Sequence, residues 1–452
     1  MIIKNGKLKV LYEYLVKVNK TAYQDRLLLA NHVLSKNPFS NNLLSKYLMN
    51  KSCEKITFID IMKYLSKFYI INYFKYIIFL IKAILDLFYS PKVDFTKCQE
   101  TYILGTFFLI DKINEDSMFK DNYLLDLDVN LEKENKSYFY LPCFYGSTGI
   151  KKFMNMLSKL KKNKVRYVSP FSLLNLIDYF KIFIDISIYP FKVLKLFFNT
   201  KENTDLDRLF KSELIFSLNS GDAIESFFRF YQGKSLAKFK NLHLIAWFEN
   251  QVIDKTFYLG INSVKNSNIK TTGAMLMLWA EEDLNYYLDK NEKNLGLLPQ
   301  KIFVNGEAYL PDNAKELDVF VGPSLRYMNI FKTKLNSNPN KILVLLPLYT
   351  NDAINILNSI SSISNWNVLV KFHPASDINK INDFVPQNFK VVGGDIYDLF
   401  SNTFLVIGNS SGALLEAFQL GIYVIIINNP NKFKYNILPY EFKRILWDED
   451  VL

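Results

Sequence analysis

His373 and Pro374 close an apolar run, VLVKFHPASD, that predicts a β-strand followed by a turn. Proline cannot donate to a strand ladder, so the imidazole is expected at the carboxyl end of the strand and not inside the sheet. A histidine there can donate a hydrogen bond to a phosphate or a carboxylate. Lys371 is close by in sequence, although its side chain alternates with that of Phe372. A surface-loop histidine without a ligand is the alternative.

A second candidate is VIGNSSGALLEA, a predicted strand, a turn of small residues and a helix that opens at Gly412. Ser410 or Ser411 can cap this helix. The free N–H groups of the turn, which begins at Asn409, and the positive end of the helix dipole then form an anion site. Glu416, about one turn into the helix, can accept two hydrogen bonds from a ribose diol. A plain N-cap without a ligand is the alternative.

Glu249 lies at the end of the predicted strand NLHLIAWFEN, with Gln251 and Asp254 just beyond it. The neighbouring Trp247 and Phe248 are expected to desolvate this carboxylate partly and to raise its pKa. A carboxylate of that kind can take a proton from a hydroxyl group, so Glu249 is the first candidate for a general base and Asp254 the second. A purely structural role in hydrogen bonding is the competing interpretation.

Arg326, in GPSLRY, could neutralise an acidic acceptor or a carboxylate of a donor. His32 and His243 are predicted to be structural, and Asp126 and Asp128 in LDLDVN to lie in a solvated loop. The sequence has no GxGxxG, no GxxxxGK[ST] and no HExxH, so it lacks the nicotinamide-cofactor, P-loop and zincin motifs. With three histidines in the chain, we expect no histidine-rich metal site.

The elements that must position these residues alternate along most of the chain. Residues 1–100 show long apolar periodic runs that predict mainly helices. From Thr101, charged helical segments separate short runs rich in β-branched and aromatic residues, namely TYILGTFFLI, SYFYLPCFY, KVRYVSP, NLHLIAWFEN, TTGAMLMLW, KIFVNG and LDVFVGPS. Such alternation predicts a parallel sheet with helices on both faces.

After the polar linker KTKLNSNPN the alternation restarts and predicts a doubly wound unit of five strands: KILVLLPL, NWNVLVKFHP, FKVVGG, TFLVIGNSS and IYVIIINNP. We therefore expect an α/β protein with a helical N-terminal region, 1–100, and two Rossmann-like domains, 101–335 and 341–452. The carboxyl ends of both sheets are expected to face one cleft, where open α/β sheets bind their ligands.

The 452 residues are 49% hydrophobic and 22% charged, a globular composition sufficient for two or three domains. The formal net charge of +11 is concentrated in residues 151–200, which hold ten lysines and arginines against Asp178 and Asp185. Three widely spaced cysteines argue against a disulfide scaffold and a structural zinc site and agree with a reducing cytoplasm. The lysine-rich N-terminus has no apolar core, so no cleaved signal peptide is expected.

Two apolar segments, Ile70–Tyr89 and Phe171–Phe198, are long enough to be considered as membrane spans. Charged residues interrupt both, so neither offers the roughly 20 nearly uncharged residues that a span requires. Both read as amphipathic helices with lysines on one side. Two interpretations stay open: a helix packed on a core with a solvated lysine face, and a helix lying on an anionic bilayer surface.

The HP and SS motifs together resemble the C-terminal nucleotide-binding domain of GT-B glycosyltransferases of bacterial surface polysaccharide assembly, including the Kdo and sialic acid transferases. The resemblance extends from Lys341 to Pro430 and implies that His373, Pro374, Ser410 and Ser411 contact the nucleotide of a CMP-linked donor. In the N-terminal part, AWFENQVIDKTFYLG and VFVGPSLRY look like surface carbohydrate biosynthesis proteins. The chain departs from the family in ending soon after its last strand, so the usual C-terminal helix is expected to be short or missing.

The resemblance implies a glycosyltransferase that is inverting and metal-independent, needs no cofactor, and moves a sugar from a nucleotide-activated donor, with CMP-linked Kdo or a sialic-acid-like sugar favoured. The acceptor would be a surface glycan or a lipid-linked molecule of capsule or lipopolysaccharide synthesis. Region 101–335 would be the acceptor domain and 341–452 the nucleotide-sugar domain. The enzyme is expected in the cytoplasm, peripheral to the inner face of the cell membrane.

Three alternatives compete with this interpretation. UDP-N-acetylglucosamine 2-epimerases also carry an NSSG-like turn followed by a glutamate, but usually have more histidines and a downstream Arg-Gln. CDP-glycerol glycerophosphotransferases share an HP-like element, but typically have an acidic residue where this chain has Asn409. A non-catalytic membrane or nucleic-acid binding protein would use the basic segment, yet no recognised nucleic-acid motif is present, so nucleic acid is not expected as a partner.

Overall fold

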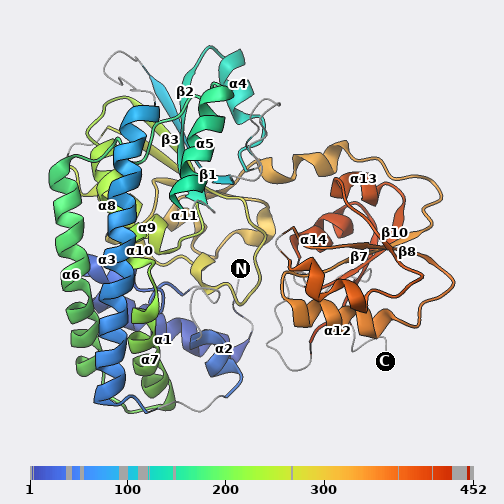
Figure 1. Cartoon of the computed structure of the whole chain (residues 1–452), viewed down its shortest axis with the longest axis horizontal. Helices are drawn as coiled ribbons and strands as arrows, with labels where there is room; N and C mark the ends of the chain where they lie inside the picture. The colour runs from blue at the N-terminus through green and yellow to red at the C-terminus, as the bar shows by residue number, and fades with distance from the viewer. Residues whose placement is uncertain are drawn as a thin grey trace. The chain divides into compact units, whose positions relative to one another are not determined.

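The computed structural model describes residues 3, 5–36, 43–50, 55–90, 100–109, 121, 123–145, 149–265, 268–374, 376–409, 411–429 and 445–447. The chain divides into two compact units, each with its own sheet (Figure 1). Unit 1 consists of Met1–Leu276 and Asp283–Arg326, and unit 2 of Met277–Glu282 and Tyr327–Leu452.

Unit 1 begins with helices: α1 (Gly6–Ala22), the 3₁₀ helix η1 (Arg26–Ala30), α2 (Leu43–Leu48) and α3 (Phe58–Tyr89). Local capping starts the longer ones. The side chain of Asn5 accepts backbone N–H groups of α1, and Thr57 forms a capping box with Asp60 at the start of α3. The predicted helical N-terminal region is confirmed.

The sheet of unit 1 has six parallel strands in the order β2-β1-β3-β4-β5-β6. Its strands are β1 (Thr101–Leu109), β2 (Ser137–Tyr145), β3 (Leu242–Trp247), β4 (Lys270–Met275), β5 (Lys301–Val304) and β6 (Val319–Val321). The order reverses between β1 and β3. The carboxyl ends of these two strands therefore flank the switch point, where doubly wound sheets bind ligands.

The helices that follow in unit 1 are α4 (Leu127–Lys133), α5 (Ile150–Lys162), α6 (Leu176–Asn199), α7 (Asp205–Phe216), α8 (Ala223–Leu236), α9 (Val252–Asn262), α10 (Lys290–Asn294) and α11 (Ala314–Leu317). Helices α8 and α9 touch through glycines: a Cβ at Gly233 would lie 2.2 Å from the carbonyl oxygen of Phe257, and one at Gly260 would lie 2.0 Å from that of Phe230. Only glycine permits this approach. The contact anchors α9, which starts directly after the loop that carries Glu249.

Two sequence predictions in unit 1 are wrong. The run KVRYVSP does not form a strand; it contributes one isolated bridge, between Tyr167 and Tyr140. Lys164 has a left-handed backbone with φ +51°, and Pro170 has no N–H group to donate to a ladder, so the run cannot extend the pairing. The segment LDLDVN is not a loop, because Leu127–Lys133 is helix α4, with Asp126 at its N-cap position and Asp128 in its first turn.

Unit 2 contains the second parallel sheet, in the order β12-β11-β10-β7-β8-β9. Its elements are β7 (Lys341–Leu345), α12 (Thr350–Ile360), β8 (Asn367–Lys371), β9 (Lys390–Val391), α13 (Ile396–Phe400), β10 (Thr403–Gly408), α14 (Gly412–Gln419), β11 (Tyr423–Ile426) and β12 (Ile445–Trp447). Read from the other edge, the order is third, second, first, fourth, fifth, sixth, which is the Rossmann order. The five predicted strands are present, and β12 is an addition.

The core of unit 2 explains why its sequence runs are nearly continuously apolar. On β7, Leu343 and Leu345 pack with α13 and α14 on one face of the sheet, whereas Ile342 and Val344 pack with α12 on the other. Figure 1 shows α13 and α14 on one side of this sheet and α12 on the opposite side. Both faces are therefore buried, as parallel sheets require. The predicted α/β class with two Rossmann-like parallel sheets is confirmed.

Among the described helices, α3 is the one long and apolar enough to cross a membrane by length and composition, and a single such helix is weak evidence for a span. A long stretch of α3 holds no more than two charged residues, so by length and composition the prediction that charged residues exclude a span is wrong for this helix. The side chains of Lys82 and Asp86 are buried within unit 1, together with Phe68 and Asn72. One face of α3 is therefore packed against protein.

Candidate functional site

In unit 2 the switch point lies between β7 and β10, and the predicted histidine element sits close to it. His373 and Pro374 follow β8, the neighbour of β7. The N–H of Ser376 donates to the carbonyl of His373 (3.0 Å), and the Ser376 hydroxyl donates to the carbonyl of Pro347 in the loop after β7 (3.3 Å). His373 remains accessible, and partial burial lowers its pKa. These hydrogen bonds hold the turn that carries His373 at the carboxyl edge of the sheet.

The small-residue turn lies on the other side of the same switch point, after β10. Ser411 is the N-cap of α14, and its hydroxyl oxygen accepts the N–H of Ala413 (3.3 Å). The amide of Asn409 donates to the carbonyl of Ile427, the residue after β11 (2.6 Å), which links the turn to the end of the next strand. Ser410 lies outside the described residues. The positive end of α14 therefore opens at the edge where His373 lies.

Glu416 and Lys371 are both engaged with α13 and the loop before it. The hydroxyl of Tyr397, near the start of α13, donates to Oε2 of Glu416, and this bond, with burial as the larger cause, raises the pKa of Tyr397. Lys371 donates to the carbonyl of Gly394 (2.8 Å). Tyr397 was not predicted from the sequence, because its contact with Glu416 joins two helices that only the fold brings together.

The turn GNSSG, residues 408–412, also has the form G-x-S-x-G that serine hydrolases use between a strand and a helix. A hydrolase would need a histidine to activate the serine hydroxyl, and His373 is the histidine that the sequence of unit 2 provides. Ser410, the serine at the nucleophile position of the pattern, lies outside the described residues. The cap formed by Ser411 is the structural role that the turn shows.

In unit 1, Glu249 follows β3 and therefore lies at the switch point between β1 and β3. Its side chain is partly buried and accepts two hydrogen bonds, one from the indole Nε1 of Trp247 (2.8 Å) and one from the amide of Gln251. Burial, followed by the nearby carboxylate of Asp254, raises the pKa of Glu249 to about 7. A carboxylate with that pKa can exchange a proton near neutral pH.

Asp254 holds the loop that presents Glu249. Its Oδ2 accepts the backbone N–H of Glu249 (3.0 Å) and that of Gln251 (3.1 Å), and the residue is buried. Burial raises its pKa. Asp254 therefore positions this loop, as part of the capping box of α9 with Gln251. It was predicted as the second candidate for the general base, and it lies next to the first candidate, Glu249.

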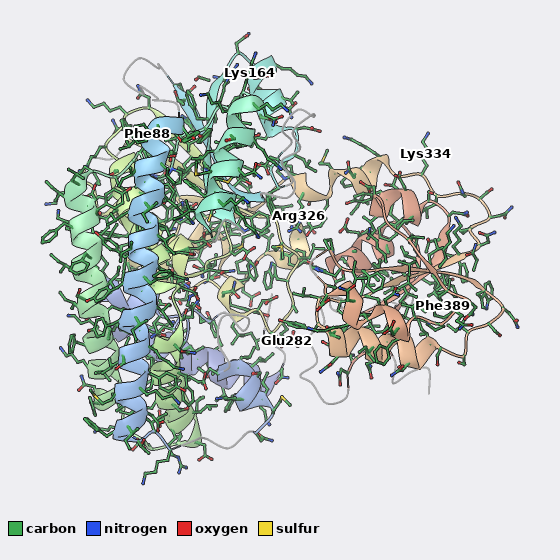
Figure 2. The ribbon with its side chains drawn as sticks, in the orientation of Figure 1. Phe88, Lys164, Glu282, Arg326, Lys334 and Phe389 are labelled. Carbon is green, nitrogen blue, oxygen red and sulfur yellow. The ribbon has the colours of Figure 1, made fainter. Side chains whose placement is uncertain are left out.

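Arg326, labelled in Figure 2, belongs to unit 1 and is the second residue of the 3₁₀ helix η7 (Leu325–Lys332), where its charge acts on Glu249. Its guanidinium lies 5.3 Å from the ring centre of Tyr123 and 5.6 Å from that of Trp247, and these two rings meet edge to face at 4.3 Å. The positive charge lowers the pKa of Glu249, although burial and Asp254 outweigh it. Glu249, Trp247 and Arg326 therefore form one cluster.

Asp121 is a further carboxyl group at this edge that was not predicted from the sequence. Its Oδ1 accepts the hydroxyl of Thr106 in β1 (3.1 Å) and the N–H of Tyr123 (2.8 Å). Burial raises its pKa to about 6. Asp121 does not directly follow a predicted strand, because the charged sequence DKINEDSMFK stands before it, so strand-end reasoning did not select it.

A cluster of buried charges lies directly behind the Glu249 loop. Glu292 Oε1 lies 3.2 Å from the ammonium groups of both Lys36 and Lys255, and Lys36 also lies 3.3 Å from Asp289. Lys255 donates to the carbonyl of Asn250 (2.7 Å), and the Asn250 amide donates to Glu292 Oε2 (3.2 Å). Asn250 has a left-handed backbone with φ +54°. The cluster therefore fixes the unusual conformation of the residue next to Glu249.

The ionisation of this cluster follows from its contacts. Burial lowers the pKa of Lys255, and Glu292 offsets that effect only in part. For Lys36, burial also lowers the pKa, but Glu292 and Asp289 together raise it above its ordinary value. Burial alone would raise the pKa of Glu292, yet the two lysines hold it below its ordinary value. Glu292 is thus an ionised carboxylate shared by two buried ammonium groups.

The two predicted structural histidines pair with acids away from these edges. His32 Nε2 lies 3.4 Å from Asp222, and His243 Nε2 lies 2.8 Å from Glu100, at the amino end of the first sheet. Within the described residues, no group of three or more His, Cys, Asp or Glu side chains could hold a metal ion. The predicted site residues fall into two sets, one at the carboxyl edge of each sheet.

Comparisons with known proteins find structural neighbours only. No family model matches the chain, and no curated protein sequence matches it. It is similar to the UDP-GlcNAc 2-epimerase of Neisseria meningitidis bound to UDP-GlcNAc (13% identity, 72% of this chain and 82% of that one, TM-score 0.39). It is also similar to CalG4, the calicheamicin glycosyltransferase (10%, 73% and 79%, 0.37), and to the E. coli heptosyltransferase WaaC (8%, 77% and 92%, 0.28). Because these TM-scores are low, the fold of each unit is assigned from its own strand order and not from these neighbours.

Proposed function

We propose that this chain is a glycosyltransferase of the GT-B type, which moves a sugar from a nucleotide-activated donor to an acceptor hydroxyl. One observation carries the proposal: the Rossmann strand order of unit 2 puts the His373–Pro374 turn and the capped start of α14 on either side of one switch point. That is the position at which doubly wound sheets bind nucleotides. This geometry supports a nucleotide site made by the His373–Pro374 turn and the start of α14.

The chemistry of these groups suits a nucleotide with a phosphate. The first N–H groups of α14 and its dipole favour an anion, and His373 can add a hydrogen bond to it. Glu416, oriented by Tyr397, supplies a carboxylate for the ribose hydroxyls. These interactions stabilise a departing phosphate without a metal ion, so we propose a metal-independent reaction that needs no cofactor.

In the proposed reaction unit 1 supplies the base. The acceptor oxygen attacks the anomeric carbon, the bond from that carbon to the phosphate oxygen breaks, and the nucleotide leaves with the electron pair. Glu249 takes the proton of the acceptor hydroxyl, and its raised pKa suits that transfer. The backside attack inverts the anomeric configuration. Arg326 offers a positive charge beside Glu249 for an acidic acceptor or a donor carboxylate.

The HP and SS motifs favour a CMP-linked donor that carries Kdo or a sialic-acid-like sugar. The acceptor is proposed to be a surface glycan or a lipid-linked precursor. A lipid-linked acceptor would place the protein in the cytoplasm at the inner face of the cell membrane, and the basic excess of residues 151–200 agrees with an anionic surface.

Replacing His373 or Ser411 by alanine is expected to weaken nucleotide binding by about 1.5–3 kcal/mol, or roughly tenfold to a hundredfold, because each change removes a contact to the phosphate or the cap that shapes its site. Isothermal titration with CMP and UDP measures this. Ser361→Ala is the matched control, since Ser361 is an exposed serine at the end of α12, at the opposite edge of the sheet. Unchanged affinity in both variants, with folded protein, would remove the assigned site.

The function itself is tested by incubating the protein with a panel of nucleotide sugars and an extract of glycolipids, with and without EDTA. Mass spectrometry then follows the released nucleotide and the product. Nucleotide release coupled to a glycosylated acceptor, unaffected by EDTA, supports the proposal. An epimerised sugar that stays on its nucleotide would favour a UDP-GlcNAc 2-epimerase-like enzyme instead, and transfer that stops with EDTA would contradict metal independence.

A further inference from the structure

Helices α3 and α6 of unit 1 pack side by side and antiparallel. The hydroxyl of Tyr69 on α3 donates to the carbonyl of Ser187 on α6 (3.0 Å), and that of Tyr76 donates to the carbonyl of Tyr179 (3.0 Å). Tyr73 stacks on Phe183 between these two bonds, with ring centres 5.4 Å apart. Figure 1 shows the two long helices next to each other. They form one continuous two-helix layer.

The outer side of this layer is apolar. Of the thirty exposed large hydrophobic side chains in the described residues, nine lie on α3 and eight on α6, so two helices carry more than half. Phe88, which Figure 2 labels on α3, is 78% exposed, and Leu176 at the start of α6 is 87% exposed. A soluble surface rarely has so many apolar side chains together, and such a patch marks a partner or a membrane.

The spacing shows that these residues share one side of each helix. On α3, Ile70, Phe74 and Ile77 are four and three residues apart, which is one helical stripe. On α6, Phe180, Ile184 and Phe191 are four and seven residues apart, which is also one helical stripe. We call the exposed side of α3 and α6 the apolar face. The opposite side of each helix is packed within unit 1.

The acidic and the basic side chains of these two helices differ in exposure. The acids Asp86, Asp178 and Asp185 are buried, and Asp185 pairs with Arg26 at 2.8 Å. Asp60 is half-buried and caps α3. The exposed charged side chains of the two helices are lysines: Lys63, Lys67, Lys181 and Lys195. Among the exposed charged side chains of α3 and α6, those beside the apolar face are therefore positive.

We propose that the apolar face of α3 and α6 docks on an anionic phospholipid bilayer, with its aromatic and aliphatic side chains in the interface and its lysines at the headgroups. The arrangement matches an interfacial amphipathic surface, in which apolar burial and attraction to anionic lipid act together. A second copy of the chain is a poorer occupant, because a two-fold pairing would bring lysine borders together. The inference rests on the proposed function for the lipid-linked acceptor, whereas docking itself requires no donor.

The test is co-sedimentation of the full chain with phosphatidylcholine vesicles, with and without phosphatidylglycerol. We expect binding that requires phosphatidylglycerol and weakens with added salt. The pair Phe180→Ser with Phe191→Ser is expected to reduce binding about tenfold or more, because two anchors are lost. The pair Lys67→Glu with Lys181→Glu is expected to have a similar effect. Phe331→Ser is the matched control, since Phe331 is 79% exposed in unit 2.

Three outcomes would overturn the proposal: no vesicle binding by the wild type, equal binding to neutral and anionic vesicles, or unchanged binding of the two double variants. Sedimentation velocity provides one more: a dimer that the phenylalanine pair dissociates would assign the face to a second copy. Because the substituted side chains are exposed, thermal unfolding should be nearly unchanged. Nucleotide affinity, measured on the same variants, separates a failure of docking from a failure of the proposed function.

Discussion

Glu249→Gln is expected to lower turnover by about 10² to 10⁴, the usual contribution of a general base, while nucleotide affinity stays nearly unchanged. Glutamine preserves the size of the side chain and can still accept from Trp247, but it cannot take the acceptor proton. The proposed nucleotide site lies in unit 2 and Glu249 in unit 1, so nucleotide affinity should not depend on this substitution. Steady-state kinetics and isothermal titration on the same preparation measure both quantities.

The pH dependence of the wild type gives a second readout of the same claim. Burial and Asp254 raise the pKa of Glu249 to about 7. If the ionised Glu249 carboxylate is the base, as proposed, kcat/KM should rise with pH through about 7 and level off above it. The Glu249→Gln variant should lose this limb of the profile. A merely structural role would lower activity without removing the limb.

Glu100→Gln is the matched control, because Glu100 precedes β1 at the amino edge of the same sheet and pairs with His243. It should retain most activity. If Glu249→Gln also retains most activity, the base lies elsewhere, and Asp254 is the next position to test. Asp254→Asn must then be checked for folding, because Asp254 accepts two backbone N–H groups of the loop.

Glu292→Ala is expected to destabilise the protein by about 3–5 kcal/mol, the cost of leaving buried charges without their partner. Glu292 is 1% exposed and contacts both Lys36 and Lys255. Without it the ammonium groups of Lys36 and Lys255 stay buried, Lys255 without its carboxylate partner and Lys36 with Asp289 alone. Urea unfolding of the wild type and the variant gives the difference in free energy of unfolding.

The sign of the pH effect is also defined. A buried lysine without its counter-ion has a depressed pKa, so folding is penalised below the unfolded-state pKa and recovers as pH rises. The deficit of Glu292→Ala should therefore shrink toward alkaline pH. Glu316→Ala is the control: its pair with Lys290 is exposed and screened by solvent, so the free energy of unfolding should hardly change. A deficit below about 1 kcal/mol in Glu292→Ala would show that the cluster does not stabilise the fold.

The strands of unit 2 could be predicted because the pattern that marks each of them is local in the sequence. Each is a short apolar run with turn residues at its ends, and both faces of the sheet are buried, as Ile342 and Leu343 on β7 show. The positions of His373 and Ser411 follow from the same logic, since a residue after a parallel strand lies at its carboxyl edge. Strand β12, with three residues, is too short to carry such a signal.

Contacts between distant elements could not be predicted. Tyr397 and Glu416 lie on two different helices, and Glu292 and Lys36 are 256 residues apart in the sequence. No local sequence pattern predicts either contact. The prediction for Glu249 drew on its aromatic neighbours, one of which, Trp247, does donate to it. Arg326 comes close to Glu249 because the chain turns back after β6, which the sequence does not reveal.

The apolar segments show a different limit. Hydrophobic periodicity predicted amphipathic helices over Ile70–Tyr89 and Phe171–Phe198, and both segments are helical for most of their length. Periodicity does not reveal which side faces the protein. The buried side of α6 includes Asp178 and Asp185, whereas Phe180 and Phe191 face outward, because Arg26 and Tyr231 bind the buried Asp185.

Nucleotide binding by unit 2 is the central claim, and a thermal-shift series on the full chain with CMP, UDP, CDP and GDP tests it most directly. We expect one of the four, with CMP favoured, to raise the unfolding temperature of the wild type in a concentration-dependent manner. The same nucleotide should give a much smaller shift with Ser411→Ala and His373→Ala and a full shift with Ser361→Ala. The absence of any shift with all four nucleotides, or an equal shift in all variants, would contradict the account.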